Sequence, residues 1–512
     1  MRPRTVMVAI IGAALTAIIL THAFDAVAQN AAETPASQPA RDDALSGMGI
    51  SVTGGAAPGY VPDRTCAMCH SKLFRSFQDV GMSRSFYEAS AKVAVEDFEN
   101  NHFFHAPSGR HYEMHLKDGR YVFRRYQLDD DGKTINNFEQ EIDWIMGSGS
   151  RVRSYLYRTP ADDLFLLPVA WYGQTRRWGM SPAFDRPTHK GVRRPITREC
   201  MFCHNAYPDV PVDSDVYGAP HTYPAELPQG IGCQRCHGPG AEHVRVSMSV
   251  DNDLESMRDS IINPGRFDRR RQNEVCYQCH MQPTVALLGV RRFGRGDYSF
   301  RPDQRLADYL VFMDVEVSGE KPSERFEINH HAYRMEQSKC FTAGGGRLGC
   351  LTCHDPHRKV REAERASHYR AACLTCHELN AHPALAAGRQ AAPSGSPDDV
   401  RANERGGAPN LDDCVSCHMP QRRPQDVVHV ASVTDHRIQR RPGGSELLAP
   451  LEEEDLFLDQ IELAENERAP RGALGQVYRA VGAMRFGDVS AVGRLARMLA
   501  AAPTPEIDPY LD

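Results

Sequence analysis

The chain contains seven copies of the pentapeptide Cys-x-x-Cys-His, and this repeat constrains its structure more than any other feature. Fourteen of its 15 cysteines and seven of its 22 histidines belong to the copies. A shuffled chain of this composition would contain about 0.02 copies, so chance does not explain the repeat. We number the copies motif 1 to motif 7 in chain order: Cys66-Ala-Met-Cys69-His70, Cys200-Met-Phe-Cys203-His204, Cys233-Gln-Arg-Cys236-His237, Cys276-Tyr-Gln-Cys279-His280, Cys350-Leu-Thr-Cys353-His354, Cys373-Leu-Thr-Cys376-His377 and Cys414-Val-Ser-Cys417-His418.

The pentapeptide is the attachment signature of c-type haem. Its two thiols form thioether bonds to one haem, and the adjacent imidazole coordinates the iron. A zinc site gives no reason for a histidine after each second cysteine, a thioredoxin-like motif occurs once and in a βαβ context, and structural disulfides would not repeat a two-residue spacer seven times. The sequence therefore predicts seven covalently bound c-type haems, held by the motif cysteines, with the motif histidines as proximal iron ligands.

The N-terminus predicts export. Arg2 and Arg4 precede an uncharged apolar run, and Ala26-Val-Ala28 fits a cleavage site, so residues 1–28 are typical of a signal peptide. The run is shorter than the about 20 residues that span a bilayer as a helix. We expect a periplasmic mature chain without a membrane span, beginning with a flexible lead-in over 29–60. The net charge of −6 argues against a nucleic-acid partner.

The expected fold is mainly α and coil, because haem faces would supply much of the apolar surface. Residues 61–440 would form a heptahaem cytochrome domain with short helices around packed haems. A small β-hairpin insertion is predicted between motifs 1 and 2, at about residues 100–140, where Asp118-Gly119 marks a turn. Residues 450–512 are predicted to be helical. Within them, 452–465 has an acidic helical pattern, and 475–488 with 491–502 resembles one tetratricopeptide-like helix pair.

Several other histidines are candidates for the second, distal ligand of an iron. For each of them a surface or core histidine is the alternative, and the sequence pairs none with a motif. Met82 could instead ligate the first haem, although a packed methionine is favoured there. The candidate distal histidines are His243, His357, His429 and His436, then His105, His330 and His331, with His382 weaker.

Cys340 is the cysteine outside the motifs and the candidate catalytic residue. A leftover thiol in an exported chain can face an open iron, bind a sulfur species or ligate iron, and an inert buried thiol is the alternative. The arginine-rich segments 151–158 and 176–177 could attract an oxyanion, but pairing with haem propionates is favoured. No Cys-x-x-Cys-Lys occurs, so the lysine-ligated haem of ammonia-forming nitrite reductases has no counterpart here.

Short segments over about residues 61–440 resemble exported bacterial multihaem c-type cytochromes, which often carry tetratricopeptide repeats after the haem region. The resemblance implies that His243, His357 and His436 are iron ligands and that Cys340 is a family feature. A more distant similarity runs to the hydroxylamine oxidoreductase and octahaem tetrathionate reductase superfamily, but with seven motifs rather than eight no specific activity is carried over. The segments are Gly147-Ser-Gly149, Arg153-Ser-Tyr-Leu156, Leu167-Pro-Val-Ala-Trp-Tyr172, Met180-Ser-Pro182, 233–243, Ser338-Lys-Cys340, 350–357, Cys417-His-Met-Pro420 and Thr434-Asp-His-Arg-Ile438.

Two functions remain open at this point. The favoured one is an electron carrier that exchanges electrons with redox partner proteins or quinol-linked donors, which needs every iron to be six-coordinate. The alternative is an oxidoreductase acting on a small nitrogen or sulfur compound, such as nitrite, hydroxylamine, sulfite or tetrathionate, at a haem with an open distal site. An interaction scaffold, based on the terminal helix pair, is compatible with either. The sequence does not indicate the oligomeric state.

Overall fold

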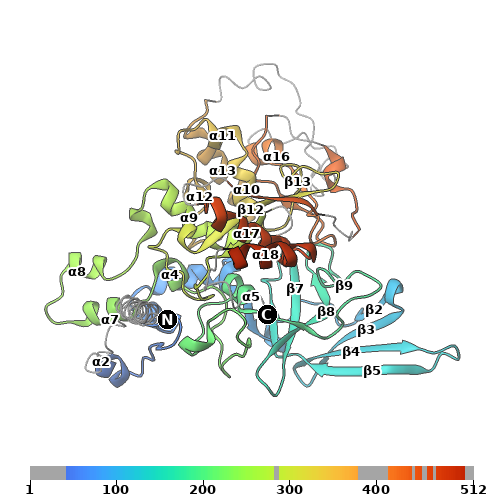
Figure 1. Ribbon diagram of the computed structural model, residues 1–512. Coiled ribbons are helices and arrows are strands. Elements are labelled where there is room, and N and C mark those ends of the chain that lie inside the picture. Colours follow the sequence, from blue (N-terminus) through green and yellow to red (C-terminus); the bar gives the residue numbers. More distant parts are fainter. Residues whose placement is uncertain are drawn as a thin grey trace, which may run out of the picture. The chain divides into compact units, whose positions relative to one another are not determined.

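The computed structural model describes residues 42–281, 287–378, 413–440, 444–452, 458–464 and 469–501 (Figure 1). The predicted signal peptide and His382 lie outside these residues. The chain divides into two units, 1–50 and 51–512. In the first, helix α2 (Asp42–Gly47) buries Leu45, whose carbonyl accepts the backbone N–H of Ile50. Everything below concerns the second unit.

The last part of the predicted lead-in packs against the rest of the second unit. Ala57 and Tyr60 are buried, and the backbone N–H of Ala56 donates to the carbonyl of Val210 over 2.8 Å. The backbone of Gly55 approaches Val210 so closely that a Cβ there would lie 1.9 Å from the Val210 oxygen. Residues 51–60 are therefore held by specific contacts.

The expectation of a mainly α and coil fold is wrong. The described residues form four antiparallel sheets: a six-stranded sheet in the order β1-β6-β7-β8-β10 with β9 beside β8, a four-stranded sheet β2-β3-β4-β5, a three-stranded sheet β11-β12-β15 and the pair β13-β14. The strands are β1 (Phe86–Glu88), β2 (His102–His105), β3 (Arg110–Lys117), β4 (Arg120–Leu128), β5 (Thr134–Glu141), β6 (Trp144–Met146), β7 (Val152–Arg158), β8 (Leu164–Tyr172), β9 (Arg177–Met180), β10 (Arg194–Pro195), β11 (Leu287–Arg291), β12 (Leu310–Val317), β13 (Gln421–Arg422), β14 (Val433–Thr434) and β15 (Leu458–Leu463).

The predicted hairpin is confirmed, but it is part of a much larger sheet-rich region over residues 86–195. Strands β3 and β4 pair in register from Lys117↔Arg120, and Asp118 and Gly119 between them have φ of 50° and 80°. Positive φ at both turn residues matches the twist of the strands. Strand β8, which the sequence analysis missed, is apolar nearly throughout and buried along most of its length.

Aromatic side chains fill the core of the sheet-rich region. Trp171, Tyr155 and Phe123 are all at most 1% exposed. Within this core the Glu96 carboxylate accepts hydrogen bonds from Arg153 (2.9 Å) and from the hydroxyls of Tyr121 and Tyr155 (2.8 Å each). The buried charge is thus both paired and hydrogen-bonded, as a buried carboxylate must be.

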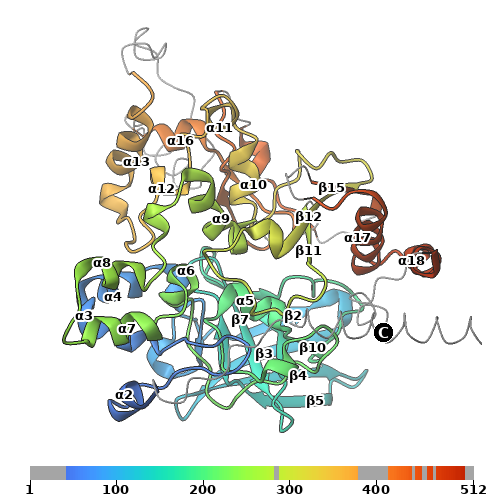
Figure 2. The ribbon, with the colours of Figure 1, turned by 60° about the vertical axis from the view of Figure 1, so that its left-hand side comes forward.

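Each motif lies on or at the end of a short helix, as predicted. The helices carrying motifs 4 to 7 pack in succession and lie together in both views (Figures 1 and 2). The helices of the second unit up to residue 418 are α3 (Asp63–Cys69), α4 (Ser71–Gln78), α5 (Arg198–His204), α6 (Gln234–His237), α7 (Ala241–Met248), α8 (Leu254–Asp259), α9 (Arg269–His280), α10 (His331–Glu336), α11 (Lys339–Thr342), α12 (Cys350–Cys353), α13 (Arg365–Leu374) and α16 (Cys414–His418).

The C-terminal segment combines a strand with the predicted helix pair. The helical expectation for 452–465 is wrong where the structure describes it, because Leu458–Leu463 is strand β15, whose apolar side chains Leu458, Ile461 and Leu463 pack against the core beneath the three-stranded sheet. Helices α17 (Gly472–Arg485) and α18 (Ser490–Ala501) form over the predicted residues and join the same core. No helix among the described residues is long and apolar enough to cross a membrane.

Candidate functional site

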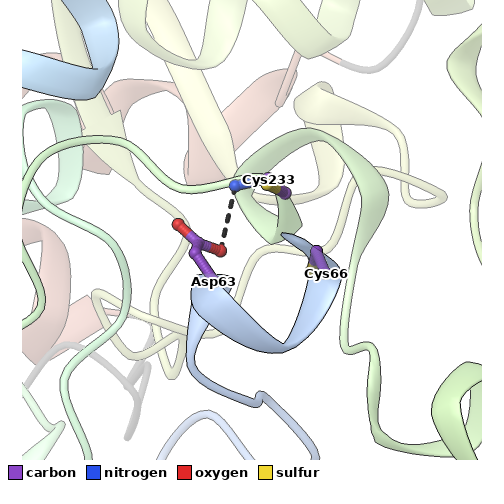
Figure 3. Close-up of side chains that lie close together, drawn as sticks. All are labelled: Asp63, Cys66 and Cys233. Carbon is purple, nitrogen blue, oxygen red and sulfur yellow. Dashed lines mark hydrogen bonds between the residues drawn. The ribbon is translucent and has the colours of Figure 1, made fainter. Parts of the chain in front are cut away.

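Motifs 1 and 3 meet at a contact between Asp63, Cys66 and Cys233 (Figure 3). One ligand atom of each residue lies within 4.8 Å of those of the others. The Asp63 carboxylate, at the start of α3, accepts the backbone N–H of Cys233 over 3.1 Å, and burial raises the pKa of Asp63. The same cluster could hold a metal ion. Both of its thiols belong to Cys-x-x-Cys-His motifs, and they would be thioethers if haem were attached as the sequence predicts. We therefore interpret Asp63 as the residue that fixes motif 3 against motif 1.

Motif 3 in turn contacts motifs 4 and 2. The Gln278 side chain of motif 4 donates to the carbonyl of Arg235 over 3.3 Å. Arg235, between the cysteines of motif 3, is buried and donates to the carbonyl of Phe202 in motif 2 over 2.5 Å. The Cys203 thiol of motif 2 and the Cys279 thiol of motif 4 also lie side by side. Motif 2 therefore touches both motif 3 and motif 4.

Motifs 4 to 7 continue the series in chain order. Asn273 of α9 accepts the backbone N–H of Cys350 over 3.1 Å and joins motif 4 to motif 5. The His368 ring donates to the carbonyl of Cys353 over 2.9 Å, which joins α13 and its motif 6 to motif 5. Arg365 of α13 lies 3.6 Å from Asp413, the N-cap residue of the motif 7 helix. The spatial order is therefore 1-3-4-5-6-7, with motif 2 beside motifs 3 and 4.

Four motif histidines face a second imidazole. The ring centroids are 6.3 Å apart for His70 and His243, 6.0 Å for His237 and His357, 6.2 Å for His354 and His436, and 5.6 Å for His280 and His331. Two metal–nitrogen bonds of about 2 Å and two ring radii of about 1.2 Å place the centroids of two trans ligands about 6.4 Å apart. Three of the four separations match this value closely, so those three pairs fit the two axial positions of a haem iron. The His280–His331 separation is shorter, and the His331 ring lies nearer to His436, at 4.5 Å between centroids.

The hydrogen bonds of these rings leave the correct nitrogen for a metal. Nδ1 donates to a backbone carbonyl in His237 (2.8 Å to Ile262), His243 (3.0 Å to Met257) and His436 (3.1 Å to Thr434). A carbonyl can only accept, so the proton is on Nδ1, and the lone pair of Nε2 is available to a metal. The motif 7 histidine shows the same bond, 2.8 Å from its Nδ1 to the carbonyl of Gln439.

Burial keeps several of these imidazoles neutral, which is the form that ligates a metal. It lowers the pKa of His436 to about 4, helped by the nearby His354, and it lowers the pKa of His204 to about 4. The pKa of His237 is also lowered, first by burial. These rings are therefore poor bases near neutral pH and suited to coordination.

Three of the predicted distal histidines are bound to carboxylates instead. His105 places Nδ1 2.7 Å from the Ser108 hydroxyl and Nε2 3.0 Å from Asp185. His429 contacts the other oxygen of Asp185 at 2.8 Å. Nε2 of His330 lies 3.0 Å from Glu327. None of these three has a ring contact with a motif histidine among the described residues, whereas His243, His331, His357 and His436 do.

The remaining candidates lie apart from these pairs. Cys340 is half-buried and close to Cys373 of motif 6. Met82 lies in a turn that also contains Ser85. The Ser85 hydroxyl is hydrogen-bonded to the carbonyl of Met82 (2.8 Å) and to that of His204 (2.7 Å), so the turn that holds Met82 contacts motif 2. Arg153 pairs with Glu96, and Arg158 donates to the carbonyls of Tyr223 and Pro224, so these two arginines serve the sheet-rich region.

The sequence analysis missed the residues that join one motif to the next. Asp63 and Asn273 each precede the first cysteine of their motif by three residues, and each accepts the N–H of a cysteine in another motif. A polar hydrogen-bond acceptor three residues before the first cysteine of a motif is therefore the sequence signal that could have identified these two residues. None of the fifteen cysteines forms a disulfide in this structure. No family model, no curated protein and no solved structure matches the chain.

Proposed function

We propose that the chain is a periplasmic multihaem c-type cytochrome that carries electrons through seven covalently bound haems. The observation that carries the proposal is the set of histidine pairs at the separation of two axial ligands, each pair formed by a motif histidine and a histidine distant in sequence. When bound, the haems would supply one-electron redox chemistry at iron. The motif cysteines would hold each group covalently.

The chain's own residues would give four of the seven irons a second imidazole and would keep the motifs in contact. His243, His357, His331 and His436 would be the distal ligands opposite His70, His237, His280 and His354. The carbonyl bonds at Nδ1 orient the rings and raise their basicity as ligands. Asp63, Arg235, Gln278, Asn273 and His368 hold successive motifs side by side. The signal peptide predicted from the sequence supports the periplasmic location, and redox partner proteins or quinol-linked donors would exchange the electrons.

The direct test is to express the full chain in a host that attaches c-type haem and to measure attached porphyrin by intact mass. Seven increments and low-spin ferric spectra are expected. The four thiol pairs across motifs (66–233, 203–279, 276–350 and 373–414) are close enough to suggest disulfides as a competing product. A chain with these disulfides and no porphyrin would refute the proposal.

The histidine assignment has matched controls in the same chain. Replacing His357 or His243 with Gln removes one proposed ligand, and one iron per chain should become high-spin. Replacing His105 or His429 with Gln removes an imidazole that contacts Asp185 instead, and all low-spin signals should remain. Equal spectra for the two sets of variants would contradict the assignment.

A further inference from the structure

Arg235 is a buried cation at the junction of motifs 2, 3 and 4. It lies between the two cysteines of motif 3 and is 3% exposed. Its charge acts on the thiols of Cys203, Cys236 and Cys279, one from each of the three motifs. A haem attached through any of these cysteines would therefore lie within reach of the same positive charge.

No carboxylate is paired with Arg235 among the residues that the structure describes. One terminal nitrogen donates to the carbonyl of Phe202, and both Nε and the other terminal nitrogen are buried without a hydrogen-bond partner. Four other buried arginines are each paired with a carboxylate: Arg153 with Glu96, Arg291 with Asp297, Arg325 with Glu320 and Arg334 with Asp435. Arg235 is thus a buried charge that the protein itself leaves uncompensated, which is costly for stability alone.

Aromatic rings hold the Arg235 guanidinium without cancelling its charge. The guanidinium carbon lies 4.3 Å from the ring centroid of Phe202 and 4.0 Å from that of Tyr207. Ring faces attract a cation but carry no net charge. Arg301 lies 5.5 Å from the same Tyr207 ring, donates to two backbone carbonyls and adds a second cation. The acidic residue nearby, Asp303, is exposed, so water and salt screen its charge.

A positive charge inside a protein favours the reduced form of a nearby haem, because reduction adds one electron to the iron. At about 10 Å and an effective dielectric constant of about 20, a unit charge changes such an equilibrium by about tenfold. Local charge and burial are among the features by which a protein sets the potential of its cofactor. A single arginine placed against three motifs would therefore act on three haems at once.

We propose, resting on the function proposed above, that Arg235, with Arg301 beside it, raises the reduction potentials of the haems on motifs 2, 3 and 4, so that electrons entering the chain collect at this junction. These haems are then the first to be reduced. Motif 2 lies beside the series 1-3-4-5-6-7, so its haem holds an electron at a branch while the series passes others on.

The first experiment is a spectroelectrochemical titration of the haem-loaded full chain. Arg235→Met removes the charge, so the most positive components, up to three of seven haems, should move to more negative potentials by about 59 mV, which is a tenfold change for a one-electron couple. Arg235→Lys, the matched control, keeps the charge and should leave these components near their original potentials. Equal shifts in both variants would give the guanidinium a merely structural role and overturn the proposal.

Two outcomes separate this proposal from the function on which it rests. If Arg235→Met carries seven haems and its titration is unchanged, the role of Arg235 is refuted and electron transfer through the haems stands. If the unsubstituted chain carries no haem, the proposed function itself is refuted.

The second experiment tests whether a haem propionate neutralises Arg235. In that case Arg235→Met would leave a carboxylate without its partner, and the potentials of the variant would depend more on pH between pH 5 and 8. We expect a shift that is the same at each pH, and a new pH dependence would overturn the uncompensated charge. If Arg235→Met lost haem, Arg301→Gln, at a half-buried position, should move the same components to more negative potentials by a smaller amount, and no shift there would overturn the proposal.

Discussion

The buried ion pair between Arg334 and Asp435 provides the sharpest test of how the protein positions a proposed ligand. Nε of Arg334 donates to Asp435 over 2.9 Å and a terminal nitrogen donates to the other carboxylate oxygen over 2.7 Å. The two side chains are 2% and 1% exposed. Asp435 directly precedes His436, the partner of His354. The pair therefore holds α10 against the segment that carries this histidine.

Asp435→Asn keeps the shape of the side chain but leaves the Arg334 cation buried without its counter-charge. Breaking a buried pair in this way costs about 3–5 kcal/mol. The control is Glu141→Gln, whose partner Arg120 is 69% exposed and whose own side chain is 47% exposed. An exposed pair of this kind contributes under about 1 kcal/mol.

The assay is chemical denaturation of the haem-loaded protein, followed by circular dichroism and by the haem absorption band, with spin state recorded in the folded protein. Asp435→Asn should lose at least about 2 kcal/mol more stability than Glu141→Gln and should convert one iron to high-spin. The double variant Arg334→Met with Asp435→Leu should recover part of the stability, because the buried Arg334 charge is removed together with its partner. Arg422, 20% exposed and 3.9 Å from Asp435, still loses its longer contact. Equal losses for Asp435→Asn and Glu141→Gln would refute the reasoning.

Three further predictions concern the sheet-rich region and the cysteine cluster. Burial raises the pKa of Glu96, but Arg153 and the hydrogen bonds to the carboxylate lower it by more, so its pKa in the folded protein lies below the ordinary 4.5. The contribution of the Glu96 charge to stability is complete above pH about 4.5 and is lost as the pH falls through the folded pKa. Glu96→Gln should therefore make the free energy of unfolding depend less on pH between pH 6 and 3. Gly119→Ala, at φ 80°, should destabilise the hairpin by about 1 kcal/mol in thermal unfolding, whereas Gly47→Ala, with no positive φ and an open surrounding, should be neutral or stabilising. Dialysis against a chelator should release no zinc by elemental analysis and leave the haem spectrum intact, because Cys66 and Cys233 would be thioethers; stoichiometric zinc would favour an ion at Asp63, Cys66 and Cys233.

The sequence was enough to predict the elements whose structure depends on neighbouring residues alone. The motif helices and the turn at Asp118-Gly119 follow from spacing and from residues that tolerate positive φ. The sequence analysis missed strand β8 because the strand is apolar and buried on both faces. It therefore lacks the alternation of apolar and polar residues from which a strand is predicted. Strand β15 was predicted to be a helix because its sequence shows only an acidic, helix-like pattern. Its pairing with β12 and its core contacts involve residues distant in sequence.

In the candidate site, too, local features were predictable from the sequence and long-range contacts were not. The motif residues stand out at fixed spacing, but the choice between His357 and His105 depends on which partner each ring reaches in the folded chain. His105 and His429 converge on Asp185, and nothing near any of them in the sequence indicates that carboxylate. Long-range packing sets these contacts, and sequence spacing does not encode them.

The direction of the histidine pairs has a consequence for biogenesis. In each pair, 70–243, 237–357, 280–331 and 354–436, the motif member comes first along the chain. If the chain is exported N-terminus first and carries haem as proposed, each of these four pentapeptides would enter the new compartment before its partner histidine. On the proposed function, haem attachment at these four motifs would not need to wait for the second histidine, which follows later in the chain.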